Sequence, residues 1–257
     1  MLLVVGQRLH ARSATLLVSL EQRLPTIMRC WLAMALGASV LRIATSPLQG
    51  HGPGFATVLP YVLLVAAPIA SMLLALRWFA DADDHAQPTT RLAVIGRWRN
   101  VSRVQARRHP LYGTTGFMVS LMIGMLLNVP VRALEYLTAV PAIGLAVPEW
   151  LRVFHAMMTL DVVLLSSLYT ITFVAALRRV PLFPRLLVAT WTLDLASQVT
   201  IAEAVARTPG LPTNVAASLL QFLDGNVHKV MISVALWLPY LLMSRRVNIT
   251  YRLRVPA

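Results

Sequence analysis

The chain has few charged residues for its length, and few of those are acidic. Only 13% of its 257 residues are charged, whereas 57% are hydrophobic and the mean hydropathy is +0.67. Soluble domains carry about 25% charged residues. Because a chain this apolar cannot hide its hydrophobic residues in one water-soluble core, lipid must be part of its solvent. The composition therefore predicts an integral membrane protein.

Cysteine and lysine are nearly absent as well. Cys30 is the only cysteine, which excludes an internal disulfide and a thiolate metal cluster, and Lys229 is the only lysine. The sequence also lacks the motifs of zinc proteases, serine esterases and P-loop proteins, and it has no Cys/His ligand pattern. It therefore predicts no catalytic residue, no metal site and no cofactor.

Six apolar runs are long enough to cross a hydrocarbon core of about 30 Å, which takes roughly 20 residues of helix. They lie near Thr26–Thr45, Phe55–Phe79, Leu111–Leu134, Leu151–Leu177, Arg185–Ala206 and Leu219–Met243. The expected fold class is all-α: a polytopic membrane helix bundle with six transmembrane helices.

The arginines alternate along these runs. Eighteen of the 22 lie in the N-terminal stretch, in or beside the loops after the second and fourth runs, and in the C-terminal tail. Only Arg42, Arg132, Arg152 and Arg207 belong to the opposite side. Because cytoplasmic loops collect Lys and Arg, both termini are expected in the cytoplasm. The same distribution argues against nucleic-acid binding, which concentrates cations on one folded face.

The one long loop, between the second and third runs, has a repeating pattern in its second half. Leu92, Ile95, Trp98, Val101 and Val104 recur every three residues with arginines between them. The spacing predicts an amphipathic helix over about residues 91–108, lying in the cytoplasmic interface with its arginines near anionic lipid headgroups. A docking helix for a partner protein is the alternative.

Three segments of the second half resemble a known family. The run ALWLPYLLMSRRVNITY ends the last apolar run, FPRLLVATWTLDLA opens the fifth, and YGTTGFMVSLMIGMLLNVPVRAL contains the third. Together they are similar to the small bacterial inner-membrane proteins catalogued as domain of unknown function 2569, over about residues 111–251. The resemblance is most specific at Trp237, Pro239, Tyr240, Ser244, Arg246, Val247 and Thr250. It is looser at Phe117, where the family typically has Trp.

This resemblance implies a bacterial inner-membrane location and no particular activity, because none is established for the family. It also divides the chain into two parts. Residues 1–110 would form a two-helix transmembrane hairpin with a basic cytoplasmic loop, and residues 111–257 a four-helix transmembrane domain. Whether the first hairpin is a duplication of the third and fourth runs stays open.

Three charged residues are expected near the middle of the membrane: Asp161, Asp194 and Lys229. Each such charge costs about 2.5–3.5 kcal/mol on insertion scales, so an Asp–Lys–Asp contact between neighbouring helices would offset the cost. Asp224 and His228, four residues apart, share a helix face nearer the outer end. His155 or His228 could relay protons to such a site. A purely structural polar clasp that fixes helix order is the alternative.

Three functions remain open at this stage. The first is an accessory or scaffolding bundle that binds lipid, a partner membrane protein or a second copy of itself. The second is a small proton- or ion-linked transporter or channel that uses the three intramembrane charges. The third, a membrane enzyme, is least favoured because the outer loops are short and mostly apolar. The first is preferred, since the paired interrupted helices of many transporters are missing.

Overall fold

The computed structural model describes residue 13 and residues 15–46, 54–81, 85–89, 96–144 and 147–257. In this part of the chain nearly all regular structure is helical. Six long helices are α2 (Leu24–Thr45), α3 (Phe55–Trp78), α5 (Phe117–Ala139), α6 (Glu149–Leu177), α7 (Phe183–Ala206) and α8 (Thr213–Met243). Residues 15–22 are helical as well and lead into α2.

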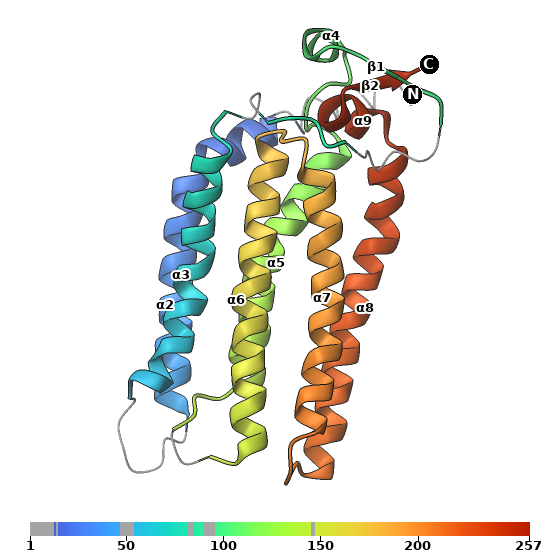
Figure 1. Ribbon diagram of the computed structural model, residues 1–257. Helices are drawn as coiled ribbons and strands as arrows, with labels where there is room; N and C mark the ends of the chain where they lie inside the picture. Colours follow the sequence, from blue (N-terminus) through green and yellow to red (C-terminus); the bar gives the residue numbers. More distant parts are fainter. Residues whose placement is uncertain (1–12, 14, 47–53, 82–84, 90–95, 145–146) are drawn as a thin grey trace, which may run out of the picture.

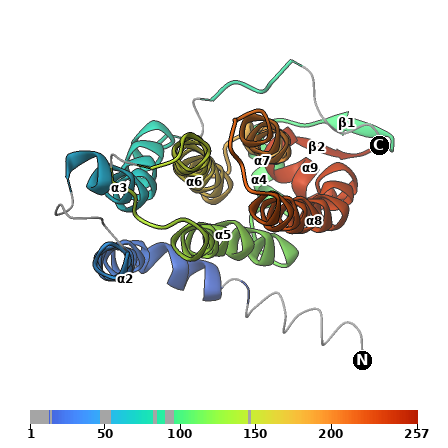
Figure 2. The ribbon, with the colours of Figure 1, turned by 90° about the horizontal axis from the view of Figure 1, so that it is seen from below.

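The long helices lie side by side in two rows. In the view along the bundle, α2, α5 and α8 form one row and α3, α6 and α7 the other (Figure 2). α6 is central, because it packs against α3, α5 and α7. Smaller elements gather at one end of the bundle, at the top of Figure 1: α4 (Arg103–Arg108), α9 (Arg245–Arg252), and the strands β1 (Trp98–Asn100) and β2 (Arg254–Pro256), which pair antiparallel.

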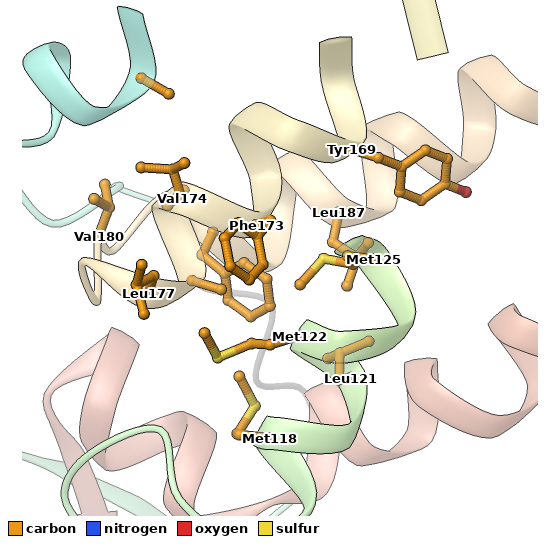
Figure 3. Packing of buried hydrophobic residues seen from close by; sticks show 14 of the residues in the cluster. Met118, Leu121, Met122, Met125, Tyr169, Phe173, Val174, Leu177, Val180 and Leu187 are labelled. Carbon is orange, nitrogen blue, oxygen red and sulfur yellow. The ribbon is translucent and has the colours of Figure 1, made fainter. Parts of the chain in front are cut away.

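The main apolar core lies where α5, α6 and α7 meet near this end. Met118 and Met122 of α5 point toward Phe173 of α6, whose ring is fully buried (Figure 3). Methionine suits this position, since a flexible thioether fills irregular gaps and contacts aromatic rings favourably. The same cluster includes Met72 and Ala75 of α3. The core thus continues across the boundary that the sequence suggested near residue 110.

Five of the six long helices are long and apolar enough to cross a membrane, which indicates a multi-pass membrane protein. The helix that is not among the five is α7, and the reason lies in its polar residues. Asp194 and Gln198 are almost completely buried, while Leu193 and Val199 are exposed. The polar residues of α7, among them Asp194, Gln198 and the exposed Glu203, lower its mean hydropathy.

The predicted amphipathic helix over residues 91–108 is wrong for the residues that the structure describes. Residues 98–100 form β1, and only Arg103–Arg108 are helical. Gly96, with φ of +101°, is in a backbone conformation that a helix does not contain. Ser102 then starts α4 as its N-cap, accepting a hydrogen bond from the amide of Gln105. The apolar spacing was misleading because pairing with β2 determines the backbone here. Residues 91–95 lie outside the described part.

Candidate functional site

The site starts from an arginine inside a long apolar helix. Arg132 follows Pro130 in α5, and only 8% of its surface is exposed. Its Nη1 donates to Oδ2 of Asp161 on α6 at 2.8 Å, and its Nη2 donates to Oδ2 of Asp194 on α7 at 2.6 Å. One guanidinium therefore joins three helices, using the planar fork that arginine has and lysine lacks. We call these three residues the buried triad.

The two carboxylates of the triad differ in how completely they are hydrogen-bonded. Oδ1 of Asp161 accepts from the Ser197 hydroxyl at 2.5 Å and from Nε2 of Gln198 at 3.2 Å. Oδ2 of Asp194 accepts from the Tyr169 hydroxyl at 2.9 Å. Oδ1 of Asp194 is buried and has no hydrogen-bond partner among the described residues. Asp161 is therefore saturated, whereas Asp194 has one oxygen available for a small ligand.

A chain of polar contacts continues from the triad to the surface of α8. Asn226 donates to Oε1 of Gln198 at 3.2 Å, and Nζ of Lys229 donates to Oδ1 of Asn226 at 3.3 Å. Lys229 also forms an ion pair with Glu135 of α5. A cavity of about 70 Å³ between α5 and α8 is lined by Glu135, Asn226 and Lys229 and reaches Arg132. The buried aspartates are thus linked to a partly exposed ion pair.

The buried triad carries an excess of negative charge. Asp161 and Asp194 contribute two negative charges and Arg132 one positive charge, while Lys229 and Glu135 offset each other. In the part of the chain that the structure describes, no other cationic side chain pairs with either aspartate. An uncompensated buried charge costs several kcal/mol even after the surroundings relax. The triad is therefore suited to hold one proton or one small cation.

The sequence predicted that Lys229 contacts both aspartates, and this prediction is wrong: Arg132 contacts them instead. Arg132 was expected beside an outer connection, because the predicted third helix ended at Leu134, two residues later. In the structure α5 continues to Ala139, so that Arg132 lies about two turns inside the helix and takes the position between the aspartates. Lys229 pairs with Glu135 instead.

The three other candidate residues lie outside the hydrogen-bond chain. Asp224 and His228 face each other on the exposed side of α8, with Oδ2 and Nδ1 3.3 Å apart. His155 is buried in α6 nearly two turns from Asp161, and its ring lies edge-on to that of Tyr136, with centroids 6.3 Å apart. Its Nε2 has no hydrogen-bond partner among the described residues. No contact connects these histidines to the triad in the described structure, so a relay through them has no support.

Sequence reasoning missed most of the network that surrounds the aspartates. The missed residues are Arg132, Glu135, Tyr169, Ser197, Gln198 and Asn226. Helical spacing contained a signal for some of them. Arg132 and Glu135 are three residues apart within one apolar run, and Asp194 and Gln198 are four apart in another, so each pair shares a helix face. Ser197 follows Asp194 by three residues and shares its helix face as well, whereas Tyr169 had no such signal, because tyrosine is common on lipid-facing and buried faces alike.

The segments that carry the family resemblance meet at the end of the bundle that holds α9. Ser244 accepts a hydrogen bond from the Val247 amide at the start of α9, and Arg246 donates to the Thr115 hydroxyl at 2.7 Å. The Thr250 hydroxyl accepts from the Gly113 amide at 3.0 Å. Gly113 has φ of +109°, a conformation that favours glycine. These contacts hold α9 against the turn that precedes α5.

Aromatic residues of the same segments extend this contact into the bundle. The Tyr240 ring packs edge-on against both Trp237 and Phe117, with centroid distances of 6.0 and 6.4 Å. Pro239 lies between Trp237 and Tyr240 on the exposed side of α8, and Val247 is completely buried in α9. The C-terminal motif and the start of α5 therefore form one packing unit, although more than 100 residues separate them in the sequence.

The last residue of α9, Arg252, is a buried arginine. Arg252 donates through Nη1 to the Leu241 carbonyl at 2.7 Å and to Oδ1 of Asn248 at 3.2 Å. Burial, and secondarily the positive charge of Arg254, lower the pKa of Arg252 to about 10. The Leu241 carbonyl near the end of α8 thus receives a charged donor, which connects the end of α9 to α8.

No family model, curated protein or solved structure matches this chain. The resemblance of residues 111–251 to the inner-membrane family therefore stays a prediction, and the function has to be argued from the geometry described above.

Proposed function

We propose that this chain is an accessory or scaffolding protein of a bacterial inner membrane that binds a partner membrane protein through α8. The proposed interface, which we call the α8 surface, consists of Asp224, His228, Lys229, Ile232 and Leu236, all exposed in the isolated chain. Glu135 of α5 borders it through its ion pair with Lys229. Six spans with both termini in the cytoplasm are part of the proposal.

Two observations favour six spans. α7 has 24 residues, which at 1.5 Å each is enough to cross about 30 Å of hydrocarbon. It also runs alongside α6 from one end of the bundle to the other, as the other long helices do (Figure 1). The central charge of α7 is compatible with lipid around the bundle, because Asp194 is buried and paired with Arg132. The arginine-rich segments α4 and α9 lie at one end of the bundle, which favours that end as the cytoplasmic one.

The observation that carries the partner proposal is the exposure of ionisable side chains on α8. The Lys229 side chain is 57% exposed, and those of His228 and Asp224 are 70% and 68% exposed. An ionisable side chain facing hydrocarbon is unfavourable by several kcal/mol unless it reaches water or is covered. A second protein with complementary polar groups would cover these side chains and exclude lipid from them. Large apolar neighbours such as Ile232, 68% exposed, would add contact area.

Site-specific photocrosslinking in native membranes tests this proposal. A photoreactive residue in place of Ile232 should form one discrete adduct, since this position lies inside the α8 surface. The same residue in place of Val40, which is 65% exposed on α2, is the matched control and should form none. Combining Lys229→Met with Glu135→Gln should reduce the Ile232 adduct about tenfold, because both partners of the exposed ion pair are then neutral.

Two results would overturn the proposal. Equal adduct yields at the Ile232 and Val40 positions would mean that α8 has no specific partner and that its adducts come from random collisions in the membrane. An adduct of twice the mass of the chain would identify a second copy of the same protein and replace the scaffold function by self-association. Arg207→Met removes an exposed pair with Glu203 elsewhere and should leave the yield unchanged.

A small proton- or ion-linked transporter or channel is the second candidate, favoured by the charge of the buried triad. One guanidinium facing two carboxylates leaves one negative charge to be neutralised. The adjoining cavity of about 70 Å³ holds a few water molecules at most, which suits a proton better than a larger solute. In proteoliposomes, Asp194→Asn and Asp161→Asn should each abolish a pH-dependent proton flux while the bundle stays folded. Absence of flux in the unaltered protein at every pH would eliminate this candidate.

A further inference from the structure

An open apolar groove lies at the side of the bundle between α2, α3 and α5. Its volume is about 530 Å³, within the range of roughly 300–1,000 Å³ typical of sites for small organic molecules. The walls are apolar side chains such as Met34 of α2, Met72 of α3 and Ile123 of α5. The groove exists because α2 packs loosely, with few of its residues buried. The Trp31 indole, which donates to the Val65 carbonyl at 3.1 Å, ties α2 to α3, and Arg42, which donates to the Val140 carbonyl at 3.1 Å, ties it to the end of α5.

The groove runs along the helices for the depth of one membrane leaflet. On α2 its lining extends from Arg23, just before the helix, to Met34, and on α5 it extends from Val119 to Pro130. Both stretches cover eleven steps, or about 16 Å at 1.5 Å per residue. Half of a hydrocarbon core of about 30 Å has nearly the same depth. A single acyl chain lying parallel to the helices would therefore extend from the membrane surface to about the middle of the membrane.

Polar lining occurs mainly at the end nearest the arginine-rich side. Ser19, Arg23 and Thr26 lie there, next to the helical residues that precede α2. Arg23 is exposed and is the basic residue of the lining, and the nearby carboxylate of Glu21 pairs with Arg178 at 3.6 Å and not with Arg23. Arg29, one turn or more further along, donates to the Pro25 carbonyl and the Thr26 hydroxyl of its own helix. A cation at headgroup level above an apolar slot matches an anionic lipid.

We propose that this groove binds one anionic phospholipid, with an acyl chain in the slot between α2, α3 and α5 and its phosphate at Arg23. The site is at the opposite end of the two rows from α8 (Figure 2), so it does not depend on the partner proposed above. Arginine pairs with phosphate through two parallel charge-assisted hydrogen bonds, which gives the site its preference for a negatively charged headgroup. The lipid would fill the space that loose packing of α2 leaves, and so join α2 to the rest of the bundle.

Native mass spectrometry of the delipidated protein in detergent tests the site. Titration with phosphatidylglycerol should give one tightly retained lipid, with phosphatidylcholine binding about tenfold more weakly. Arg23→Gln should remove this preference, whereas Arg29→Gln should keep it, because Arg29 is directed to its own helix. Inorganic phosphate at the same concentration should displace nothing, since the acyl chain supplies most of the binding.

A second pair of variants tests the slot itself. Ile123→Trp places an indole in the groove and should prevent retention of both lipids, while Leu36→Trp, on an exposed part of α2 outside the groove, should not. The proposal is overturned if Arg23→Gln leaves the headgroup preference intact, or if a folded Ile123→Trp variant retains lipid as before. Displacement by phosphate alone would instead identify an anion site without a lipid.

Discussion

Replacing Arg132 by methionine tests the central feature of the bundle. The substitution keeps a long flexible side chain but removes both guanidinium contacts, at 2.8 Å to Asp161 and 2.6 Å to Asp194. It leaves two buried carboxylates without a cation. Removing one partner of a buried ion pair typically costs about 3–5 kcal/mol. We expect Arg132→Met to lower the free energy of unfolding by at least that amount, because two carboxylates lose their partner at once.

Reversible unfolding in mixed detergent micelles gives this quantity directly. The matched control is Arg207→Met, which breaks an exposed pair with Glu203 four residues away and should cost under about 1 kcal/mol. Adding Asp161→Asn and Asp194→Asn to Arg132→Met should restore most of the loss, because neutral amides can hydrogen-bond without a cation. The reasoning is refuted if Arg132→Met and Arg207→Met have equal effects on stability.

Two further substitutions probe the geometry of the contacts. Arg132→Lys keeps the positive charge but cannot present two nitrogens in a fork, so it should still lose about 1–3 kcal/mol in the same unfolding assay; full stability would show that charge alone is sufficient. Thr250→Val leaves the buried Gly113 amide without its acceptor at 3.0 Å, and it should increase hydrogen exchange of the α9 amides by roughly tenfold or more; unchanged exchange would mean that this contact does not hold α9.

The positions of the long helices were predictable from local sequence. The predicted ranges Phe55–Phe79 and Leu151–Leu177 agree with α3 and α6 to within two residues. Apolar run length is a strong signal, because a helix in lipid must satisfy every backbone group internally. The errors are at helix ends. The third helix begins at Phe117 and not at Leu111, since Gly113 and Gly116 both have positive φ and keep the chain out of the helix.

The candidate site was predictable only in part. That Asp161 and Asp194 needed a cation followed from the cost of burying charge. Which cation they would find did not, because Arg132 and Lys229 both occur within apolar runs. Successive side chains on a helix point about 100° apart. The rotation of α5 and α8 about their own axes therefore decides whether Arg132 or Lys229 faces the aspartates, and local sequence does not specify that rotation.

Composition and the lengths of the apolar runs by themselves determined that this is a mostly helical chain of membrane type, because apolar length is a local property. Only the tertiary structure decided that Arg132 joins α5 to both aspartates, that Lys229 remains at the surface with Glu135, and that α2 leaves an open groove. These are consequences of helix rotation and packing distance, which depend on all the helices together and are not contained in any one stretch of sequence.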